Sequence, residues 1–168
     1  MATRRLAAVI EVRPLEAPER EWAVAFLQES WGGVVARRSE LVDPTTLPGF
    51  VALVAAERVG LATYAVRGDG CEVVTIDSLR EGLGVGRALL DAVRDAAVEA
   101  GCRRLWLVTT NDNVRALCIY QRWGMEIVAF RRDAVTEARK TLKPSIPERA
   151  KNGIRIQHEL ELELRLDH

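Results

Sequence analysis

Residues 80–93 read REGLGVGRALLDAV and place Gly82, Gly84 and Gly86 at alternate positions directly before a helical pattern. An apolar run at residues 71–79, CEVVTIDSL, precedes them, so the segment has the order strand, glycine loop, helix. The first turn of a helix leaves backbone N–H groups unpaired, and the helix dipole places partial positive charge there. Glycine lets an anion approach the backbone because it has no Cβ. The stretch therefore predicts a phosphate site.

Two common phosphate-binding motifs do not match this stretch. A P-loop requires G-K-[ST] where the helix starts, whereas the residues after Val85 read GRA. A dinucleotide-binding fold requires G-x-G-x-x-G, and counting from Gly82 the third glycine position is occupied by Arg87. That fold also needs an acid near the end of the next strand, where residues 109–110 are both threonine. Both classes of site are excluded.

The rest of the chain shows strand and helix periodicities in an order that predicts one α/β fold. We expect a central mixed, mostly antiparallel sheet flanked by helices, with a parallel right-handed unit around the glycines. Residues 34–49 are expected to be irregular. Turns are expected near residues 57–60 and 67–70, between the strands of the next segment. Strands are expected at residues 7–13, three times within 50–79, and at 103–110, 125–131 and 158–166; helices are expected at 17–31, 85–100, 113–123 and 133–142.

Composition limits the class of protein. The 168 residues are enough for one domain, residues 1–168, with a helix-loop-strand extension at about 133–168. Lysine plus arginine equals aspartate plus glutamate at 24 each, so the charge balance argues against nucleic acid as a partner. The 3 cysteines are scattered, which predicts no metal site and fits a cytoplasmic protein. No apolar run approaches a membrane span, and the N-terminus reads as a strand rather than a signal peptide.

Two motifs resemble those of the GNAT family of N-acetyltransferases. Residues 80–90, REGLGVGRALL, resemble the family's pyrophosphate loop, [QR]-x-x-G-x-[GA], with Gly84 and Gly86 at the two small positions. Residues 111–125, NDNVRALCIYQRWGM, resemble the segment N-x-x-A-x-x-x-Y-x-x-x-G-F. The residues in register there are Asn113, Ala116, Tyr120 and Gly124, with Met125 in place of phenylalanine. The chain departs at Glu81, which occupies the glutamine or arginine position of the loop, so that this acid must point away from a phosphate.

The resemblance implies acetyl-CoA as acyl donor, a primary amine on a small molecule or peptide as acceptor, and direct transfer between them. The pyrophosphate is expected over the backbone amides from Leu83 to Ala88. The pantetheine is expected along the strand ending Asp77-Ser78-Leu79, like an added strand. The cofactor-binding residues expected in full are Asp77, Ser78, Leu79, Leu83, Gly84, Val85, Gly86, Arg87, Ala88 and Asn113. Asn113 is explained equally well as a plain N-cap of the helix expected at residues 113–123.

Tyr120 stands at the family's general-acid position and is expected to protonate the leaving thiolate. The general base is either Glu72 or Asp77, both on the strand before the loop. Their odd separation sends them to opposite faces of a regular strand, and only a bulge brings both to the site.

The final strand alternates strictly between leucine and charged residues, which predicts a solvated face bearing Glu159, Glu161 and Glu163. These acids and His158 are secondary candidates for attracting a cationic amine. Residues 141–157, an insertion before this strand, are expected either to cover the side of the site where the acceptor amine binds or to form a homodimer contact. The alternative to an enzyme is an acyl-CoA-binding GNAT-like module that senses the ligand or binds a partner without turnover.

Overall fold

The computed structural model describes residues 7–167, so residues 1–6 and residue 168 lie outside it. The strands of its main sheet are β1 (Glu11–Pro14), β4 (Gly49–Val54), β5 (Glu57–Arg67), β6 (Gly70–Ser78), β7 (Arg104–Thr110), β8 (Glu126–Arg131) and β9 (Glu159–Arg165). They lie in the order β1-β4-β5-β6-β7-β9-β8. Neighbours are antiparallel except β6 and β7, which confirms the predicted mixed sheet. The first strand begins later than predicted, at Glu11.

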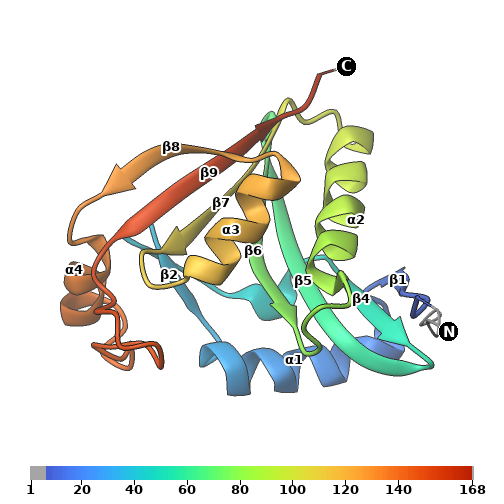
Figure 1. Ribbon diagram of the computed structural model, residues 1–168, viewed down its shortest axis with the longest axis horizontal. Coiled ribbons are helices and arrows are strands. Elements are labelled where there is room, and N and C mark those ends of the chain that lie inside the picture. Colours follow the sequence, from blue (N-terminus) through green and yellow to red (C-terminus); the bar gives the residue numbers. More distant parts are fainter. Residues whose placement is uncertain (1–6, 168) are drawn as a thin grey trace, which may run out of the picture.

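The parallel pair β6–β7 is short. The two strands are paired only over Gly70–Glu72 and Arg104–Trp106. Beyond that point β6 continues to Ser78 beside β5 alone, while β7 continues to Thr110 beside β9. Figure 1 shows the two strands diverging. The second half of β6 therefore has one edge with no strand paired to it, at the end of the strand that leads into the glycine loop.

Helices cover both faces of the sheet (Figure 1). The helices are α1 (Ala17–Trp31), α2 (Val85–Glu99), α3 (Val114–Trp123) and α4 (Ala134–Thr141). Apolar residues of α2 and α3 pack with the sheet in one large core, which includes Leu89, Val93 and Tyr120. Leu27 of α1 packs against Leu61 in a second cluster. These two clusters define the α2 face and the α1 face of the sheet, since side chains along β5 alternate between them.

The turn between β4 and β5 differs from the prediction. It lies at Ala55 and Ala56, which both adopt positive φ, and residues 57–60 belong to β5. Gly60 had suggested a turn, but it serves close packing instead. A Cβ at Gly60 would lie 2.5 Å from Cγ1 of Val85, so glycine lets α2 approach β5. The predicted hairpin turn at residues 67–70 is confirmed, with Gly68 at positive φ.

Residues 34–49 are not irregular as predicted. They form a hairpin of β2 (Val35–Arg37) and β3 (Glu40–Val42), followed by the 3-10 turn η1 (Pro44–Thr46). The hairpin turn, Arg38 and Ser39, has positive φ at both residues, a conformation that usually requires glycine or asparagine. The usual sequence signal was therefore missing. Contacts with the sheet hold this turn: the Arg38 N–H lies 3.2 Å from both carboxylate oxygens of Glu159, and its guanidinium stacks over Trp106 at 5.0 Å.

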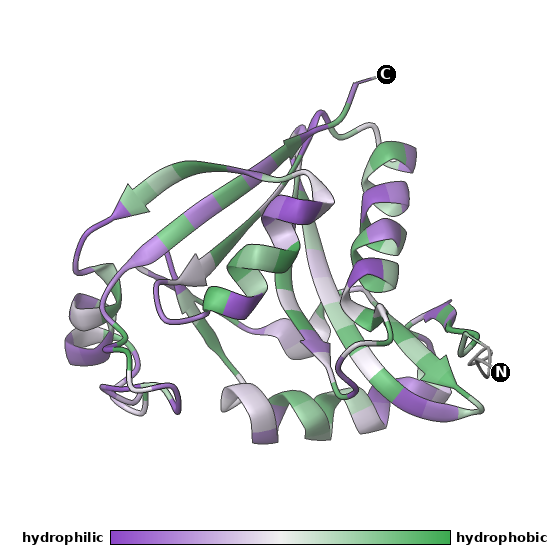
Figure 2. Ribbon diagram, viewed as in Figure 1, coloured by the Kyte–Doolittle hydropathy of each residue, from purple (hydrophilic) through white to green (hydrophobic). Residues whose placement is uncertain are grey.

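The predicted solvated face of β9 is wrong. The alternation itself is present, as Figure 2 shows along the strand, but Glu159 is 2% exposed and Glu161 is 5% exposed. Arg131 of β8 forms an ion pair with Glu161, and the β2–β3 turn covers Glu159. The acids are buried because β9 lies in the interior of the sheet, between β7 and β8, and its polar face is covered by arginines and the hairpin.

The segment after α4 returns to the end of α1. Lys143 Nζ donates hydrogen bonds to the carbonyls of Trp31 and Val34, at 2.5 and 2.7 Å. This places an ammonium group at the carbonyl end of α1, where the helix dipole favours a cation. His158 has a local role too, since its Nδ1 accepts a hydrogen bond from the Asp133 N–H that precedes α4. Within the described residues, no helix is long and apolar enough to cross a membrane.

Candidate active site

The N-terminus of α2 offers three backbone donors. Ala88 N–H donates to the Gly84 carbonyl at 3.0 Å, which is the first bond of the helix. The amides of Val85, Gly86 and Arg87 precede it and have no partner among the described residues. The predicted contact of the Ala88 amide with a phosphate therefore needs correction, because that amide is already used. The other three amides give this end of the helix a partial positive charge.

The glycines of this loop are required for different reasons. Gly82 and Gly84 adopt φ of +77° and +82°, a region that disfavours side chains. Gly86 has no such φ, and a Cβ there would meet no protein atom within 4 Å. Neither backbone strain nor packing explains a glycine in this first helical turn, where alanine is the better helix former. A ligand that lies against the backbone does explain it, and the loop therefore fits a bound pyrophosphate.

The free edge of β6 supplies further donors. The Leu79 N–H donates to the Val59 carbonyl at 2.7 Å, so Leu79 faces β5. Bonding direction alternates along an antiparallel strand, and in the observed register Asp77 also faces β5. The backbone groups of Ile76 and Ser78 then face away from β5, toward the gap between the strands where β7 no longer pairs with β6. This gap is called the opening. Among the residues predicted to contact the cofactor on this strand, Ser78 has a backbone amide that is free to bind it, whereas the Leu79 amide is bonded to β5. Ile76, which was not predicted, also has a free amide.

A bulge brings both candidate bases to one face. Thr63 pairs with Thr75 while Tyr64 pairs with Val73, which leaves Val74 as an extra residue in β6. Because of this insertion, Glu72 and Asp77 both lie on the α1 face, opposite Ala65 and Leu61 respectively. An unbroken strand would have separated them.

The two acids nevertheless have different environments. Glu72 is 3% exposed, and both of its carboxylate oxygens accept hydrogen bonds from the Arg37 guanidinium, each at 2.7 Å. This bidentate pair raises the pKa of Arg37 and fixes the β2–β3 hairpin to the sheet. The lone pairs of Glu72 that face Arg37 are therefore occupied.

Asp77 is held on one side only. The indole Nε1–H of Trp31 donates to Oδ2 of Asp77 at 2.8 Å. The other oxygen, Oδ1, has no hydrogen-bond partner among the described residues and is not sealed from solvent. Burial raises the pKa of this carboxyl above its usual value, against a lowering by the Trp31 hydrogen bond. A carboxyl with a raised pKa and one free oxygen has the properties of a general base near neutral pH.

Tyr120 lies on α3 and is 7% exposed. Its hydroxyl makes no hydrogen bond within the described part of the chain and is not sealed from solvent. Burial, with a smaller contribution from the charge of Asp77, raises the pKa of the phenol. The hydroxyl therefore stays protonated at neutral pH and is available as a proton donor. Tyr120 packs in the same core cluster as Val85 at the start of α2, and Ile76 of β6 packs against that cluster.

Other predicted residues have mixed outcomes. Asn113 precedes α3 but makes no capping hydrogen bond with its side chain; its Nδ2 lies 3.2 Å from Oγ1 of Thr109. The side chains of Leu79, Leu83 and Val114 are exposed around the opening, where apolar atoms of a cofactor arm could cover them. Sequence reasoning missed Trp31, because an aromatic residue on an amphipathic pattern is most simply read as core.

Glu81, the acid at the departure from the loop motif, has its charge paired. It forms an ion pair with Arg115 in the first turn of α3. Arg80 forms a similar exposed pair with Glu57 in the β4–β5 turn region. Arg87 has no ion-pair partner among the described residues and lies beside the free amides.

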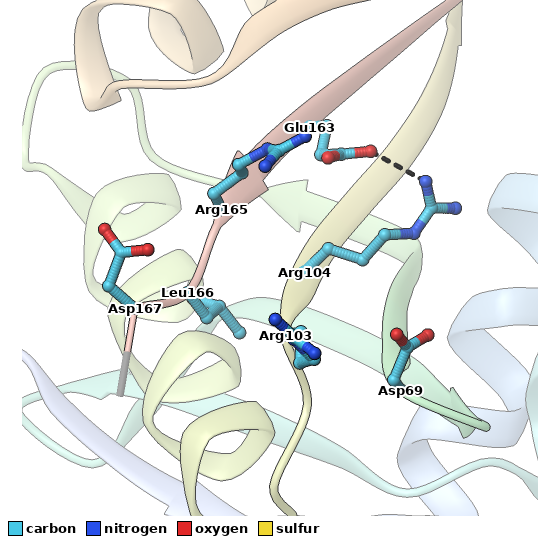
Figure 3. Close-up of a pocket in the computed structure, with 7 residues that line it drawn as sticks. All are labelled: Asp69, Arg103, Arg104, Glu163, Arg165, Leu166 and Asp167. Atoms are coloured by element: carbon cyan, nitrogen blue, oxygen red, sulfur yellow. Dashed lines mark hydrogen bonds and ion pairs between the residues drawn. The ribbon is translucent and has the colours of Figure 1, made fainter.

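A cavity of about 270 Å³ lies elsewhere, at the start of β6 and β7 and the end of β9 (Figure 3). Of the predicted site residues it contains only Glu163, a secondary candidate for attracting the amine. Its lining mixes both charges, and Arg104 in it is already paired with Glu163 at 2.7 Å. Among the described residues, no group of histidine, cysteine and acidic side chains is arranged to hold a metal ion.

The arrangement of a glycine loop before α2 and a diverging strand pair has a match among known proteins. Residues 11–125 match the acetyltransferase (GNAT) family model. The chain belongs to the GNAT family. The matched segment runs from the start of β1 to just beyond the end of α3, and so includes the glycine loop, strands β6 and β7, and Tyr120.

Relatives of this GNAT chain agree with the fold. A Bacillus subtilis (strain 168) protein of uncharacterised function, YdhI, is 42% identical over 137 residues, which cover 80% of this chain and 85% of that protein. A B. subtilis acetyltransferase solved in complex with CoA is 19% identical with a TM-score of 0.64, covering 95% of this chain and 99% of that one. A GNAT family acetyltransferase from Elizabethkingia anophelis with acetyl-CoA bound is 18% identical, also with a TM-score of 0.64, covering 94% and 98%.

Proposed function

We propose that this GNAT protein transfers an acetyl group from acetyl-CoA to a primary amine of a small molecule or peptide, by direct attack of the amine. One observation carries the proposal. The free edge of β6 leads into the unpaired amides of α2, Asp77 lies at the end of that edge, and Tyr120 packs in one core cluster with Val85 of α2. The family and the CoA-bound relatives support this choice of donor.

Binding of the donor uses the backbone. The amides of Val85, Gly86 and Arg87 hold the pyrophosphate, with the Arg87 side chain adding charge. The backbone groups of Ile76 and Ser78 bond the amide groups of the pantetheine arm, which lies beside β6 in the place of a strand. A backbone N–H of this edge also polarises the thioester carbonyl as negative charge develops on its oxygen.

The chemistry needs one base and one acid. Asp77 accepts a proton from the bound ammonium through Oδ1, directly or through a water molecule, so that the nitrogen lone pair becomes free. The nitrogen then forms a bond to the thioester carbon, and the carbon–sulfur bond breaks. Tyr120 donates its hydroxyl proton to the leaving sulfur. After the attack the nitrogen loses its second proton to the phenolate, which restores Tyr120, and Asp77 releases the first proton to solvent. The products are an acetylated amine, CoA and one proton.

Asp77 is preferred over Glu72 as the base on geometry. Glu72 lies under the β2–β3 hairpin, with both oxygens bonded to Arg37. Using it would require the loss of a buried ion pair, which is strongly unfavourable. Asp77 has a free oxygen and lies at the end of the strand nearest the glycine loop. Glu72 is proposed to act as the anchor of the hairpin.

Thermal unfolding with acetyl-CoA, CoA, NAD and ATP tests donor binding first. A ligand at about 100 times its dissociation constant stabilises the folded state by roughly 2.7 kcal/mol. Stabilisation by the two CoA species alone is expected; equal stabilisation by ATP or NAD would contradict the assignment. Turnover is then measured with spermidine, an aminoglycoside and a short peptide as amines. CoA release should be followed by chromatography, since the exposed Cys118 thiol would react with thiol reagents. Binding without turnover would favour the non-catalytic acyl-CoA module.

A further inference from the structure

Trp31 links two distant parts of the chain at the proposed active site. It is the last residue of α1, and its indole reaches β6 to donate to Asp77 Oδ2 at 2.8 Å. The ring also packs against two apolar clusters, the one that contains Leu27 and a further one that contains Val35, Val42, Ala65 and Val74. The indole is therefore held by packing on its carbon atoms and aims its only donor at the carboxylate.

Lys143 fixes the same residue from the other side. Its Nζ donates to the main-chain carbonyls of Trp31 and Val34. Burial lowers the pKa of this ammonium, and among the described residues no carboxylate pairs with it. A partly buried cation whose partners are carbonyls has a structural purpose at this position, which is to hold the end of α1. The connection then runs from Lys143 through Trp31 to Asp77.

We propose that Trp31 is a positioning residue for Asp77 and that Lys143 holds Trp31 in place for this role. The inference rests on the proposed function, since it assumes that Asp77 receives the amine proton. With Oδ2 bonded to the indole, the carboxylate has one fixed orientation and presents Oδ1 to the amine. The segment after α4 thereby takes part in acetyl transfer without touching either substrate.

The surroundings of Asp77 allow a clean titration. From α1 it faces the neutral indole, and from β5 it is paired with apolar Leu61. From α3 the titratable group coupled to it is Tyr120, which remains protonated at neutral pH. The ammonium of Lys143 bonds to carbonyls and not to this carboxylate. A change in the Asp77 titration after substitution of Trp31 therefore reports on the indole hydrogen bond.

The experiment compares Trp31→Phe with Trp22→Phe, a control on the same helix whose ring stacks on Phe26, whereas the indole hydrogen bond to Asp77 comes from Trp31. Carbon-13 NMR of labelled aspartate carboxyls gives the Asp77 pKa directly, and Asp77→Asn identifies the resonance. We expect Trp31→Phe to raise this pKa by about one unit and the control to leave it unchanged. An unchanged pKa in Trp31→Phe overturns the inference.

The pH profile of kcat/KM gives the second readout, with the fastest amine of the panel as probe. Its acidic limb should move to higher pH in Trp31→Phe by the same amount as the NMR value. Lys143→Met should move it in the same direction by less, and Lys143→Arg, which keeps the donors, should restore it. If the acidic limb of the kcat/KM profile stays fixed while the Asp77 pKa measured by NMR shifts, the Trp31–Asp77 hydrogen bond has no role in catalysis and the inference is overturned. Absence of turnover in the wild-type protein, by contrast, overturns the proposed function itself.

Discussion

The carboxylate of Glu81, in the loop before α2, forms an ion pair with the guanidinium of Arg115, in the first turn of α3. A cation in the first turn of a helix is unfavourable for the helix dipole, so this arginine is not placed there for the stability of α3. The pair joins the elements on either side of the opening between β6 and β7. Both groups are exposed, and such a pair exchanges readily for a phosphate.

Glu81→Gln is predicted to strengthen CoA binding a few-fold, because Arg115 then becomes free to pair with a phosphate of the ligand. The gain should shrink as salt rises. Titration calorimetry at two ionic strengths measures it. Glu99→Gln is the matched control, since it removes the same charge at the far end of α2. Weaker binding in Glu81→Gln would contradict the exchange.

Gly86→Ala is predicted to separate stability from binding. Alanine is the better helix former and meets no protein atom here, so the free protein should gain up to about 1 kcal/mol. CoA binding should weaken because the new methyl group lies where the pyrophosphate approaches. Urea unfolding and calorimetry give the two values. Asp95→Ala, an exposed change within α2, should alter stability alone. Unimpaired CoA binding in Gly86→Ala would remove the loop from the phosphate site.

Glu72→Gln is predicted to lower the free energy of unfolding by about 3 kcal/mol, since it leaves the buried Arg37 without a counter-charge. Urea unfolding measures this. Glu40→Gln, which removes the exposed partner of the same arginine, should have little effect. The double change Arg37→Met with Glu72→Leu should recover most of the loss. If Glu72→Gln keeps full stability and loses turnover, Glu72 regains the role of base.

Asp77→Asn is predicted to abolish turnover without loss of stability at neutral pH. Burial raises the folded-state pKa of Asp77 above its unfolded value. The stability contributed by this carboxyl is therefore greatest below the unfolded pKa and is lost as pH rises through the folded pKa. Asparagine keeps an acceptor for Trp31 and cannot ionise. The variant should match or exceed the wild-type Tm at about pH 8, with the difference narrowing toward about pH 4. The opposite trend would contradict the raised pKa.

Tyr120→Phe is predicted to lower kcat by about 10²–10⁴-fold while the dissociation constant of CoA stays nearly unchanged. The ring remains in the core, and only the proton donor is lost. Single-turnover kinetics with acetyl-CoA measure the step. Tyr64→Phe, which keeps its stack on Phe50, serves as the control. An unaltered rate in Tyr120→Phe would assign the proton to solvent.

The elements with strong periodicity were predictable from sequence, including the order of strands and helices around the glycine loop. The β2–β3 hairpin was not, because its turn uses Arg38 and Ser39 at positive φ without glycine. Contacts made far along the chain, with Glu159 and Trp106, stabilise that turn. The sequence pattern of the hairpin itself does not indicate these distant contacts.

The site was predictable where its chemistry lies in the backbone. Spacing predicted free amides at the start of α2, where Val85, Gly86 and Arg87 have them and Ala88 does not, and the family resemblance made Tyr120 a candidate acid. The proposed choice of Asp77 over Glu72 needed the structure, because it rests on the bulge at Val74 and on the hydrogen-bond partner of each acid. Glu159 and Glu161 misled because alternation indicates two faces of a strand but not which of them is wet.

The place of β9 in the sheet has a consequence for how the protein folds. β9 lies between β7 and β8, yet the ribosome makes it after both. Until then β7 is paired to β6 at three residue positions only, and β8 has no neighbour. A nascent chain that has passed Arg131 thus exposes unpaired strand edges that invite wrong partners. Chaperones that cover such edges should therefore matter most in the interval between β8 and β9.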